Sequence, residues 1–500
     1  MQVVHSVSQF TSCQFTKLES LALKLNQTAF TDKEMQDLIE GFQKCSQLSS
    51  LFIQIKFSSA INNQNIKQLL SGLQKLIQLI HLQVDLNFSW IENSGIQELG
   101  YVLKYLSNLK TLDLNLSNNL IQNDGIIILV KSLENCLNIQ DLKLSLSAAR
   151  ISDKGVADIF LSLCQIKNLS SLSLDLQHNQ IGCQGASDIG QKLVQLKQLN
   201  ILEIELSNNQ IRDEGIKNLS LGIKQIKSLV ALNLFIRYNY FTIEGVNQLG
   251  RHLVYSENML KLVLDIGFNK LQCDDNNFEL VSSLASNKNL KFLQLEAKSC
   301  QINSQIAAQI GKGLSQFLNL QQLTLKLNFN FIDQSGACQI ANELSSCQNF
   351  EELNLELDQN KIGDLGVIGL VSNIKKIQNL KSLSLDLKNT QLGTKGIEEL
   401  GQHLGSHSHL LKLKISLHGN NIDDKGGFSL GVSLGQSKSL QILELLIGAN
   451  NELTVFGKNQ MFSNLKQNKF IIALNIAKKN SINQITKNKL HKMLRLTKFT

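Results

Sequence analysis

The chain contains no proline and is poor in arginine, since only 5 of its 49 basic residues are Arg and the rest are Lys. At the usual frequency of ~5%, about 25 prolines would be expected. Because Asn, Gln, Lys and Ile are abundant at the same time, we attribute this bias to an AT-rich genome and give it no functional meaning. Charged residues make up only 18% and apolar residues 43% of the chain, which excludes an intrinsically disordered protein.

Cysteine pairs, long apolar runs and a secretory leader are also lacking. The 9 cysteines occur singly, with no CxxC pair, which argues against a disulfide framework and against a zinc site. No apolar run approaches the ~18 residues that span a membrane. The first residues, MQVVHSVSQF, show neither the basic nor the apolar region of a signal peptide. We therefore expect a chain with no transmembrane segment in a reducing, cytoplasmic compartment.

Catalytic signatures are missing as well. The sequence has no GxxxxGK[ST] loop, no HExxH and no kinase HRD or DFG motif. Repeats fill the chain and leave no room for a catalytic domain, so we predict that it is not an enzyme and that it has no cofactor. His403, His407 and His409 have metal-like spacing, but no Cys or carboxylate completes the set. We interpret them as an ordinary helix end and predict no metal site.

What the chain does have is one repeated pattern, LxxLxLxLxxNxIxxxGxxxLxxxL, at steps of 30 or 31 residues. In the copy that opens at Leu169, leucines at every second position from Leu172 predict a strand with one buried side. Asn179 follows at a turn, where its amide can satisfy backbone groups. Gly185 marks the turn into a helix whose buried stripe begins at Ile189. The opening residues are Leu18, Leu48, Leu79, Leu109, Ile139, Leu169, Leu199, Leu229, Met259, Leu290, Leu320, Phe350, Leu380, Leu410, Leu440 and Ile471.

This pattern resembles the ribonuclease-inhibitor-like leucine-rich-repeat family, whose members include Ran GTPase-activating proteins and the sensor halves of NOD-like receptors. The resemblance covers Leu18 to about Lys479. That family has LxxLxLxxN, whereas this chain has LxxLxLxLxxN, a longer form similar to repeat arrays of ciliate protists. The resemblance implies partner binding by the concave face and its rims, and it implies no particular partner. The acidic tail of the first group and the nucleotide-binding module of the second are missing here.

The predicted fold is an α/β leucine-rich-repeat solenoid, a horseshoe of about 15–16 repeats. One repeat cannot bury its own apolar face, but stacked repeats make a continuous core. Parallel strands would form the concave face and α-helices the convex face. We expect an N-terminal cap at 1–17, the solenoid at 18–479 and a basic C-terminal cap helix at 480–500.

Acidic residues recur on the predicted concave face. Six residues after the opening residue, seven of fifteen repeats carry a carboxylate, and two carry a lysine. Like charges on neighbouring strands, ~4.8 Å apart, repel by roughly 0.9 kcal/mol even in water. The acids could serve a basic partner, could be a consensus residue copied by duplication, or could bridge calcium. They are Asp85, Asp175, Glu205, Asp265, Glu296, Glu356 and Asp386.

Aromatic residues make up only 6% of the chain, yet they cluster around the Asn turn. Trp, Tyr and Arg are the residue types most often found in binding hot spots. Some rings, Phe241 and Phe331 in particular, could instead cover the edge of the core. The predicted partner-binding residues are Asp175, Glu203, Glu205, Phe235, Arg237, Tyr238, Tyr240, Asp265 and Phe268, with Phe88, Trp90 and Phe329 as a secondary rim.

Positive charge is concentrated at the C-terminal end. Residues 457–500 hold ten Lys or Arg and no Asp or Glu, so they account for the whole formal charge of +8. The segment could be a lysine-rich end cap, or it could bind nucleic acid or an anionic surface.

We expect a non-catalytic protein–protein interaction scaffold that binds a partner with a basic surface through the concave face and its rim. Two alternatives stay open. One is a regulator of an enzyme, such as a GTPase-activating type, for which Arg237 is the candidate residue at the rim. The other is a nucleic-acid or anionic-surface binder acting through 457–500.

Overall fold

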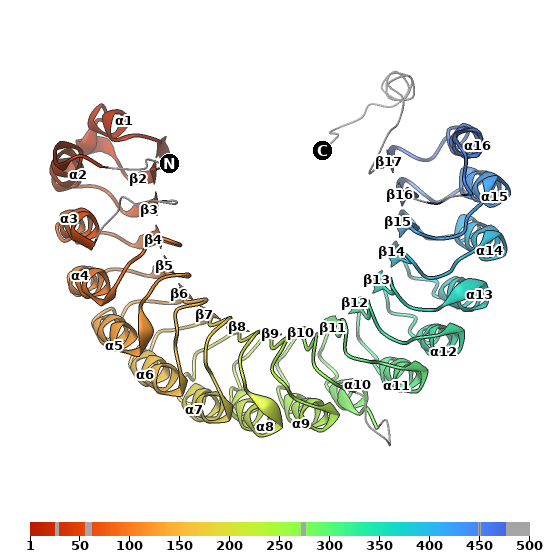
Figure 1. Ribbon diagram of the computed structural model, residues 1–500, viewed down its shortest axis with the longest axis horizontal. Coiled ribbons are helices and arrows are strands. Elements are labelled where there is room, and N and C mark those ends of the chain that lie inside the picture. Colours follow the sequence, from red (N-terminus) through yellow and green to blue (C-terminus); the bar gives the residue numbers. More distant parts are fainter. Residues whose placement is uncertain (26–29, 56–62, 272–276, 449, 451, 477–500) are drawn as a thin grey trace. The chain divides into compact units, whose positions relative to one another are not determined.

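A leucine-rich-repeat solenoid fold is confirmed in a computed structural model, in which the chain divides into two compact units with the boundary after Phe241. Within each unit strands and helices alternate along the chain, the strands pair in parallel, and the helices cover the outer side of the sheet (Figure 1). The residues that the structure describes are 1–25, 30–55, 63–271, 277–448, 450 and 452–476.

In the first unit, strands and helices alternate up to the final strand, β9. Its strands are β1 (Gln2–Val4), β2 (Ser20–Leu25), β3 (Ser50–Ile55), β4 (His81–Asp85), β5 (Thr111–Asn115), β6 (Asp141–Ser145), β7 (Ser171–Asp175), β8 (Ile201–Glu205) and β9 (Ala231–Phe235). Its helices are α1 (Val7–Thr11), the 3₁₀ turn η1 (Phe15–Lys17), α2 (Asp32–Lys44), α3 (Asn63–Leu73), α4 (Asn93–Leu103), α5 (Gln122–Leu133), α6 (Asp153–Leu163), α7 (Cys183–Leu193) and α8 (Arg212–Ile223).

The second unit continues the same alternation. Its strands are β10 (Lys261–Asp265), β11 (Phe292–Glu296), β12 (Gln322–Lys326), β13 (Glu352–Glu356), β14 (Ser382–Asp386), β15 (Lys412–Ser416), β16 (Ile442–Leu446) and β17 (Ala473–Ile476). Its helices are α9 (Ile243–Leu253), α10 (Leu280–Leu284), α11 (Ser304–Leu314), α12 (Gln334–Leu344), α13 (Gly363–Ile374), α14 (Thr394–Gly405), α15 (Asp424–Gly435) and α16 (Val455–Leu465).

The repeat length fixes the register of the sheet. In the β7–β8 pair, Leu172 lies opposite Leu202 and Leu174 lies opposite Ile204, so equivalent positions of successive repeats stack. Leu174 is 1% exposed. Within each unit the strands line the inner side of a curved stack (Figure 1), because paired strands lie closer together than packed helices do.

A buried asparagine joins many of the repeats to their neighbours, and it satisfies backbone groups at the turn as the sequence pattern predicted. The Asn119 amide nitrogen donates to the carbonyl oxygens of Leu116, in its own repeat, and of Leu86, in the preceding one, at 2.9 Å each. Its Oδ1 accepts from the backbone N–H groups of Ser89 and Ile91 at 3.1 and 3.0 Å. The bond to the preceding repeat recurs at Asn179, Asn209, Asn239, Asn330, Asn360, Asn420 and Asn450.

The recurring glycines differ in place from the prediction. Gly185 was expected at the turn into the helix, but it lies within the first turn of α7. A Cβ atom there would lie 2.5 Å from Asp153 Oδ1 and 2.9 Å from Ile181 Cγ2. The residue must therefore be glycine because neighbouring side chains fill the space that a Cβ would need. A Cβ at Gly190 would collide with the carbonyl oxygen of Asn218 on α8, so the glycine at this position lets the two adjacent helices pack closely.

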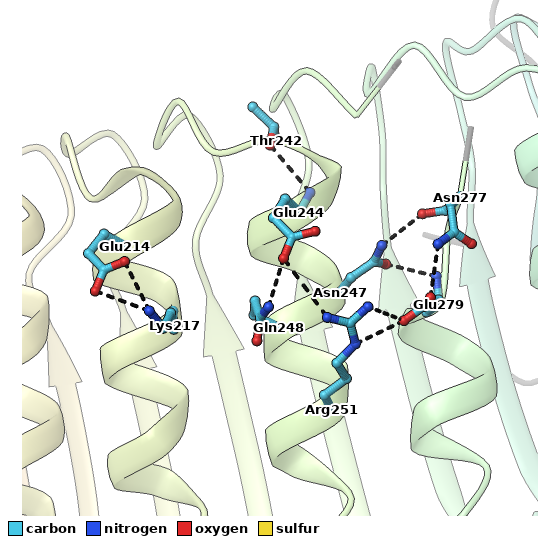
Figure 2. A network of polar contacts seen from close by, with 9 residues as sticks. All are labelled: Glu214, Lys217, Thr242, Glu244, Asn247, Gln248, Arg251, Asn277 and Glu279. Carbon is cyan, nitrogen blue, oxygen red and sulfur yellow. Dashed lines mark hydrogen bonds and ion pairs between the residues drawn. The ribbon is translucent and has the colours of Figure 1, made fainter. Parts of the chain in front are cut away.

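One helix of the second unit is unexpectedly short. Helix α10 has 5 residues, whereas α9 has 11. Asn247 of α9 donates to the carbonyl oxygen of Asn277 and accepts from the N–H of Glu279, both at 2.7 Å, and Arg251 donates to Glu279 at 2.5 and 2.9 Å (Figure 2). These side chains hold the chain before Leu280 in place, so the helix begins only there.

The predicted caps have different outcomes. Residues 1–17 form β1, α1 and η1, and β1 pairs with β2, while the Phe10 ring is buried 5.2 Å from the Phe42 ring. The predicted C-terminal cap helix at 480–500 lies outside the described residues. Among the helices that are described, none is both long and apolar enough to cross a membrane.

We predict that Asn209→Ala destabilises the first unit by at least about 3 kcal/mol. Asn209 is 2% exposed, and its loss leaves the Ile181 N–H and the carbonyl oxygens of Leu176 and Leu206 without this partner. Denaturant titration and amide hydrogen exchange at Ile181 would measure the effect. Ala149 occupies the equivalent position naturally, so the backbone tolerates alanine.

The exposed neighbour Gln210→Ala is the matched control. Equal stabilities for the two variants would show that the buried amide does not hold the repeats together.

Candidate functional site

The inner face of β7–β9 carries a carboxylate held between strands. Glu203 Oε1 accepts from Ser173 Oγ at 2.9 Å, and Glu203 Oε2 accepts from Asn233 Nδ2 at 2.8 Å. The three residues stand side by side on neighbouring strands. The charge of Glu203 is therefore fixed in position before any partner arrives.

The predicted acidic residues at the strand ends also hold the following turn. Asp175 and Glu205 accept from the backbone N–H two residues later, at 3.0 and 2.8 Å. Asn115 makes the same bond at 3.2 Å, so the bond does not require a charge. Burial raises the pKa of Asp175 and of Glu205 above their ordinary values, while the nearby charge of Arg237 acts against the shift at Glu205.

The aromatic residues that follow β9 lie at the edge of the sheet in the first unit. Phe235 ends β9 and is half-buried, as is Arg237, whose backbone N–H donates to Ser207 Oγ at 3.1 Å. Tyr238 is 44% exposed and Tyr240 is 73% exposed. The two exposed phenol rings thus follow β9, the strand that pairs with β8, which carries Glu203 and Glu205.

Both tyrosines adopt a backbone conformation that suits few residues. Tyr238 has φ of 50° and Tyr240 has φ of 60°. Bulky residues with positive φ are genuine outliers, because Cβ crowds the carbonyl, at roughly 1–2 kcal/mol each. The position of Tyr238 has positive φ in twelve consecutive repeats, occupied by Phe88, Asn118, Ala148, His178, Asn208, Tyr238, Phe268, Ser299, Phe329, Gln359, Asn389 and Gly419.

The turn geometry explains this conformation without explaining the rings. At ten of these twelve residues the N–H donates to the next repeat, as Asn208 does to the Arg237 carbonyl oxygen at 2.8 Å. In most repeats the residue that follows is the buried asparagine. Asparagine and glycine adopt positive φ at lower strain than aromatic residues do. Four of the twelve positions nevertheless carry a Phe or Tyr.

The secondary rim in the first unit has the same character. Phe88 and Trp90 have φ of 55° and 53°, and the Trp90 ring is 66% exposed. Phe241, by contrast, is buried and belongs to the core, as expected for a ring that covers its edge.

In the second unit the predicted residues separate. Asp265 is 1% exposed and accepts from the Gly267 N–H at 3.0 Å, so its carboxylate is not presented at the surface as an outward-facing position would be. Phe268 lies at the sheet edge with φ of 57°. The sequence pattern could not show this burial, because the alternation of strand residues gives every such position the same direction.

A lysine that sequence reasoning missed lies between two of the aromatic rings. Lys298 Nζ lies 5.7 Å from the centre of the Phe268 ring and 4.8 Å from that of Phe329, within cation–π range. Phe331 was considered as a cover for the core edge, but it is 65% exposed. The sequence feature that could have predicted this cluster is the spacing of about one repeat between Phe268, Lys298 and Phe329.

Close to this cluster, Asp358 is a buried carboxylate that accepts from Asn328 Nδ2. Burial, and then the nearby charge of Asp386, raises the pKa of Asp358 to about 6, while Lys388 acts against the shift. Glu356 adds to the repulsion and Lys298 opposes it.

The three histidines do not form a ligand set. His407 is buried, with Nε2 3.2 Å from the Ile377 carbonyl oxygen and Nδ1 accepting from the His409 N–H at 3.3 Å, and burial lowers its pKa. His403 Nε2 lies 3.5 Å from Glu399. Within the described residues, no group of three or more His, Cys, Asp or Glu could hold a metal ion.

Comparison with known proteins agrees with the repeat fold. A family model described as Leucine Rich repeat matches residues 172–190 and 198–220, which belong to two successive repeats. The match supports placing the chain among leucine-rich-repeat proteins. No curated protein matches the chain.

Two solved structures show limited likeness. One is described as the crystal structure of the Rad7 and Elc1 complex in yeast, with 17% identity over 88% of this chain and 92% of that one, at a TM-score of 0.42. The other is Leiomodin-1 actin-binding site 2, with 20% identity over 29% of this chain and 82% of that one, at a TM-score of 0.25. Likeness of this degree says nothing about the partner of this chain.

Removing an aromatic ring from a strained position should stabilise the fold. We predict that Tyr238→Asn raises the free energy of unfolding by about 1 kcal/mol, because asparagine tolerates positive φ. The reverse exchange one repeat earlier, Asn208→Tyr, should lower it by a similar amount. Denaturant titration measures both, and a loss of stability in Tyr238→Asn would mean that the ring stabilises the fold.

A second prediction concerns pH. Because the folded-state pKa of Asp358 is raised to about 6, the folded protein binds this proton more tightly than the unfolded chain does. Its contribution to stability is therefore present below about pH 4 and is lost as pH rises through about 6. Asp358→Asn should thus be more stable than wild type at pH 7.5, with the difference vanishing near pH 4.

Thermal melts across this range would check the prediction, with the exposed Glu352→Gln as a control for the loss of one charge. A constant difference between Asp358→Asn and wild type at every pH would contradict it.

Proposed function

We propose that this chain is a non-catalytic scaffold that binds a protein through the inner face and edge of its repeats. The proposed contact in the first unit comprises the carboxylates of Asp175, Glu203 and Glu205 and the side chains of Phe235, Arg237, Tyr238 and Tyr240. A partner that offers basic side chains beside an apolar surface would match it. Phe268 and Phe329 in the second unit, and Phe88 and Trp90 in the first, are further candidates.

The observation that carries the proposal is the exposure of Tyr238 and Tyr240 at positions of positive φ. Rings that are neither buried nor well suited to their backbone conformation are not explained by folding. Strained residues with a surface role are typical of binding sites. Tyrosine supplies a large contact area with little conformational entropy to lose, so these two rings suit a protein interface.

The carboxylates of this contact would favour a partner with basic side chains. Glu203 is fixed by two hydrogen bonds from its neighbouring strands, so its charge needs little reorganisation on binding. Fixed charge at an interface favours a complementary partner and speeds association. Asp265, being buried, is left out of the proposed surface.

Arg237 was the candidate for a GTPase-activating role. Its positive charge opposes the raised pKa of Glu205, so we assign Arg237 to the acidic and aromatic contact. The ribonuclease-inhibitor-like subtype, its long ciliate-like form and a cytoplasmic localisation belong to the same proposal. For binding through 457–500, the described part offers Lys458, Lys466 and Lys469, and residues 477–500 lie outside it.

The test begins with affinity purification from the source cells on immobilised wild-type protein and on a Phe235→Ala, Tyr240→Gln double variant. Glutamine is chosen because Gln301 and Gln391 occupy the position of Tyr240 with positive φ in other repeats. A partner bound at this site should lose at least ~2 kcal/mol of affinity, or about thirtyfold, in titrations with the purified protein.

The matched control is the Tyr101→Gln, Tyr105→Gln double variant, which removes two exposed rings at the end of helix α4 in the same unit, outside the proposed contact. It should retain the partner. Full-strength binding by a correctly folded Phe235→Ala, Tyr240→Gln protein would rule out the proposed contact.

A further inference from the structure

The opposite edge of the second unit, where the strands begin, carries a polar groove of about 520 Å³. Two rows of side chains line most of it, each with one residue from successive repeats. One row precedes the opening residues and consists of Asn289, Asn319, Asn349 and Asn379. The other row follows them and consists of Leu260, Lys291, Gln321, Glu351 and Lys381. Lys288 adds a third ammonium group.

The asparagine row has a fixed orientation. Asn289, Asn319 and Asn379 each donate their amide nitrogen to a backbone carbonyl oxygen of the preceding repeat at 2.8 Å, and Asn349 makes the equivalent bond. All four side chains are exposed. With the nitrogen committed to the protein, each amide turns its oxygen, a hydrogen-bond acceptor, away from that bond. The groove therefore offers a row of acceptors beside a row that contains lysines.

The charge of the groove is positive. Glu351 is paired with Lys381 at 2.9 Å, and Lys288 and Lys291 are exposed at the other end. Lysines often neutralise the carbonyl end of a helix, but that effect fades within the last turn. Helix α10 ends at Leu284 and helix α13 at Ile374, so Lys288, Lys291 and Lys381 lie beyond the last turn. Helix ends do not account for them.

We propose that this groove binds an extended acidic peptide. Its lysines would pair with carboxylates, and its amide oxygens would accept from the peptide backbone N–H groups. Four stacked repeats span about 15 Å at ~4.8 Å a strand, the length of four to five extended residues. The site therefore fits two acidic clusters about that far apart, one reaching Lys288 and Lys291 and the other Lys381.

Nucleic acid fits the same groove less well. A phosphodiester backbone has no N–H donors for the asparagine oxygens, and single-stranded binding relies on aromatic rings on which bases stack. The described residues that line the groove include neither an aromatic ring nor an arginine. The site is separate from the aromatic edge at the strand ends, so it stands or falls independently of the function proposed above.

The experiment is fluorescence anisotropy at low salt with a labelled peptide of about seven residues that has two glutamates at each end. The full chain should bind it, and the Lys288→Gln, Lys291→Gln, Lys381→Gln variant should bind about tenfold more weakly, since each exposed ion pair contributes a few-fold. Gln321→Trp, which fills the groove at unchanged charge, should weaken binding to a similar extent.

The control for general electrostatic attraction is Lys75→Gln, Lys110→Gln, Lys197→Gln, three exposed lysines of the first unit. It should keep wild-type affinity. Equal losses in the two triple variants, or undiminished binding by Gln321→Trp, would overturn the proposal. So would tighter binding of a labelled oligothymidine that depends on Lys288, Lys291 and Lys381, because the groove would then belong to nucleic acid.

Discussion

The structure depends above all on a buried amide group that recurs in most of its repeats. Asn119, and its equivalents in other repeats, donates to carbonyl oxygens of two successive repeats and accepts N–H groups from the earlier one. The backbone at this turn has no partner of its own, and a buried polar group without a partner is costly. A single repeat therefore cannot satisfy its turn alone, which makes stacking a requirement of the polar core as well as of the apolar one.

The turn around this amide also constrains which residues lie at the surface. Strand-end residues such as Asp175 can accept a backbone N–H of the turn, and the residue before the asparagine must take a positive φ. Side-chain identity is otherwise free at both places. Acidic residues at the strand end and aromatic residues before the asparagine are therefore not required by the turn. The positive φ of Tyr238 makes an aromatic residue less favourable there than the asparagine found in other repeats.

The sequence alone was sufficient to predict the repeat, the parallel strands and the asparagines that satisfy backbone groups at the turn, because these depend on spacing. It could not predict that Asp265 is buried, that Gly185 lies inside a helix, or that α10 is short. Each depends on side chains of a neighbouring repeat, such as Asp153 beside Gly185 and Asn247 beside Glu279. Lys298 between Phe268 and Phe329 was missed for the same reason.

The positive-φ position has a consequence for how such a protein can evolve. Its side chain points away from the buried amide, so Asn208 and Tyr238 occupy it in adjacent repeats of one frame. Exchange there would alter the proposed contact at a modest, local cost in stability and would leave the core unchanged. Recombination between repeats could carry a ring from one position to another along the array. Binding specificity could therefore diverge through exchange of a few residue types at one position of each repeat, while the backbone stays the same. Antibody loops also vary on a constant framework, but here the variable positions recur once per repeat.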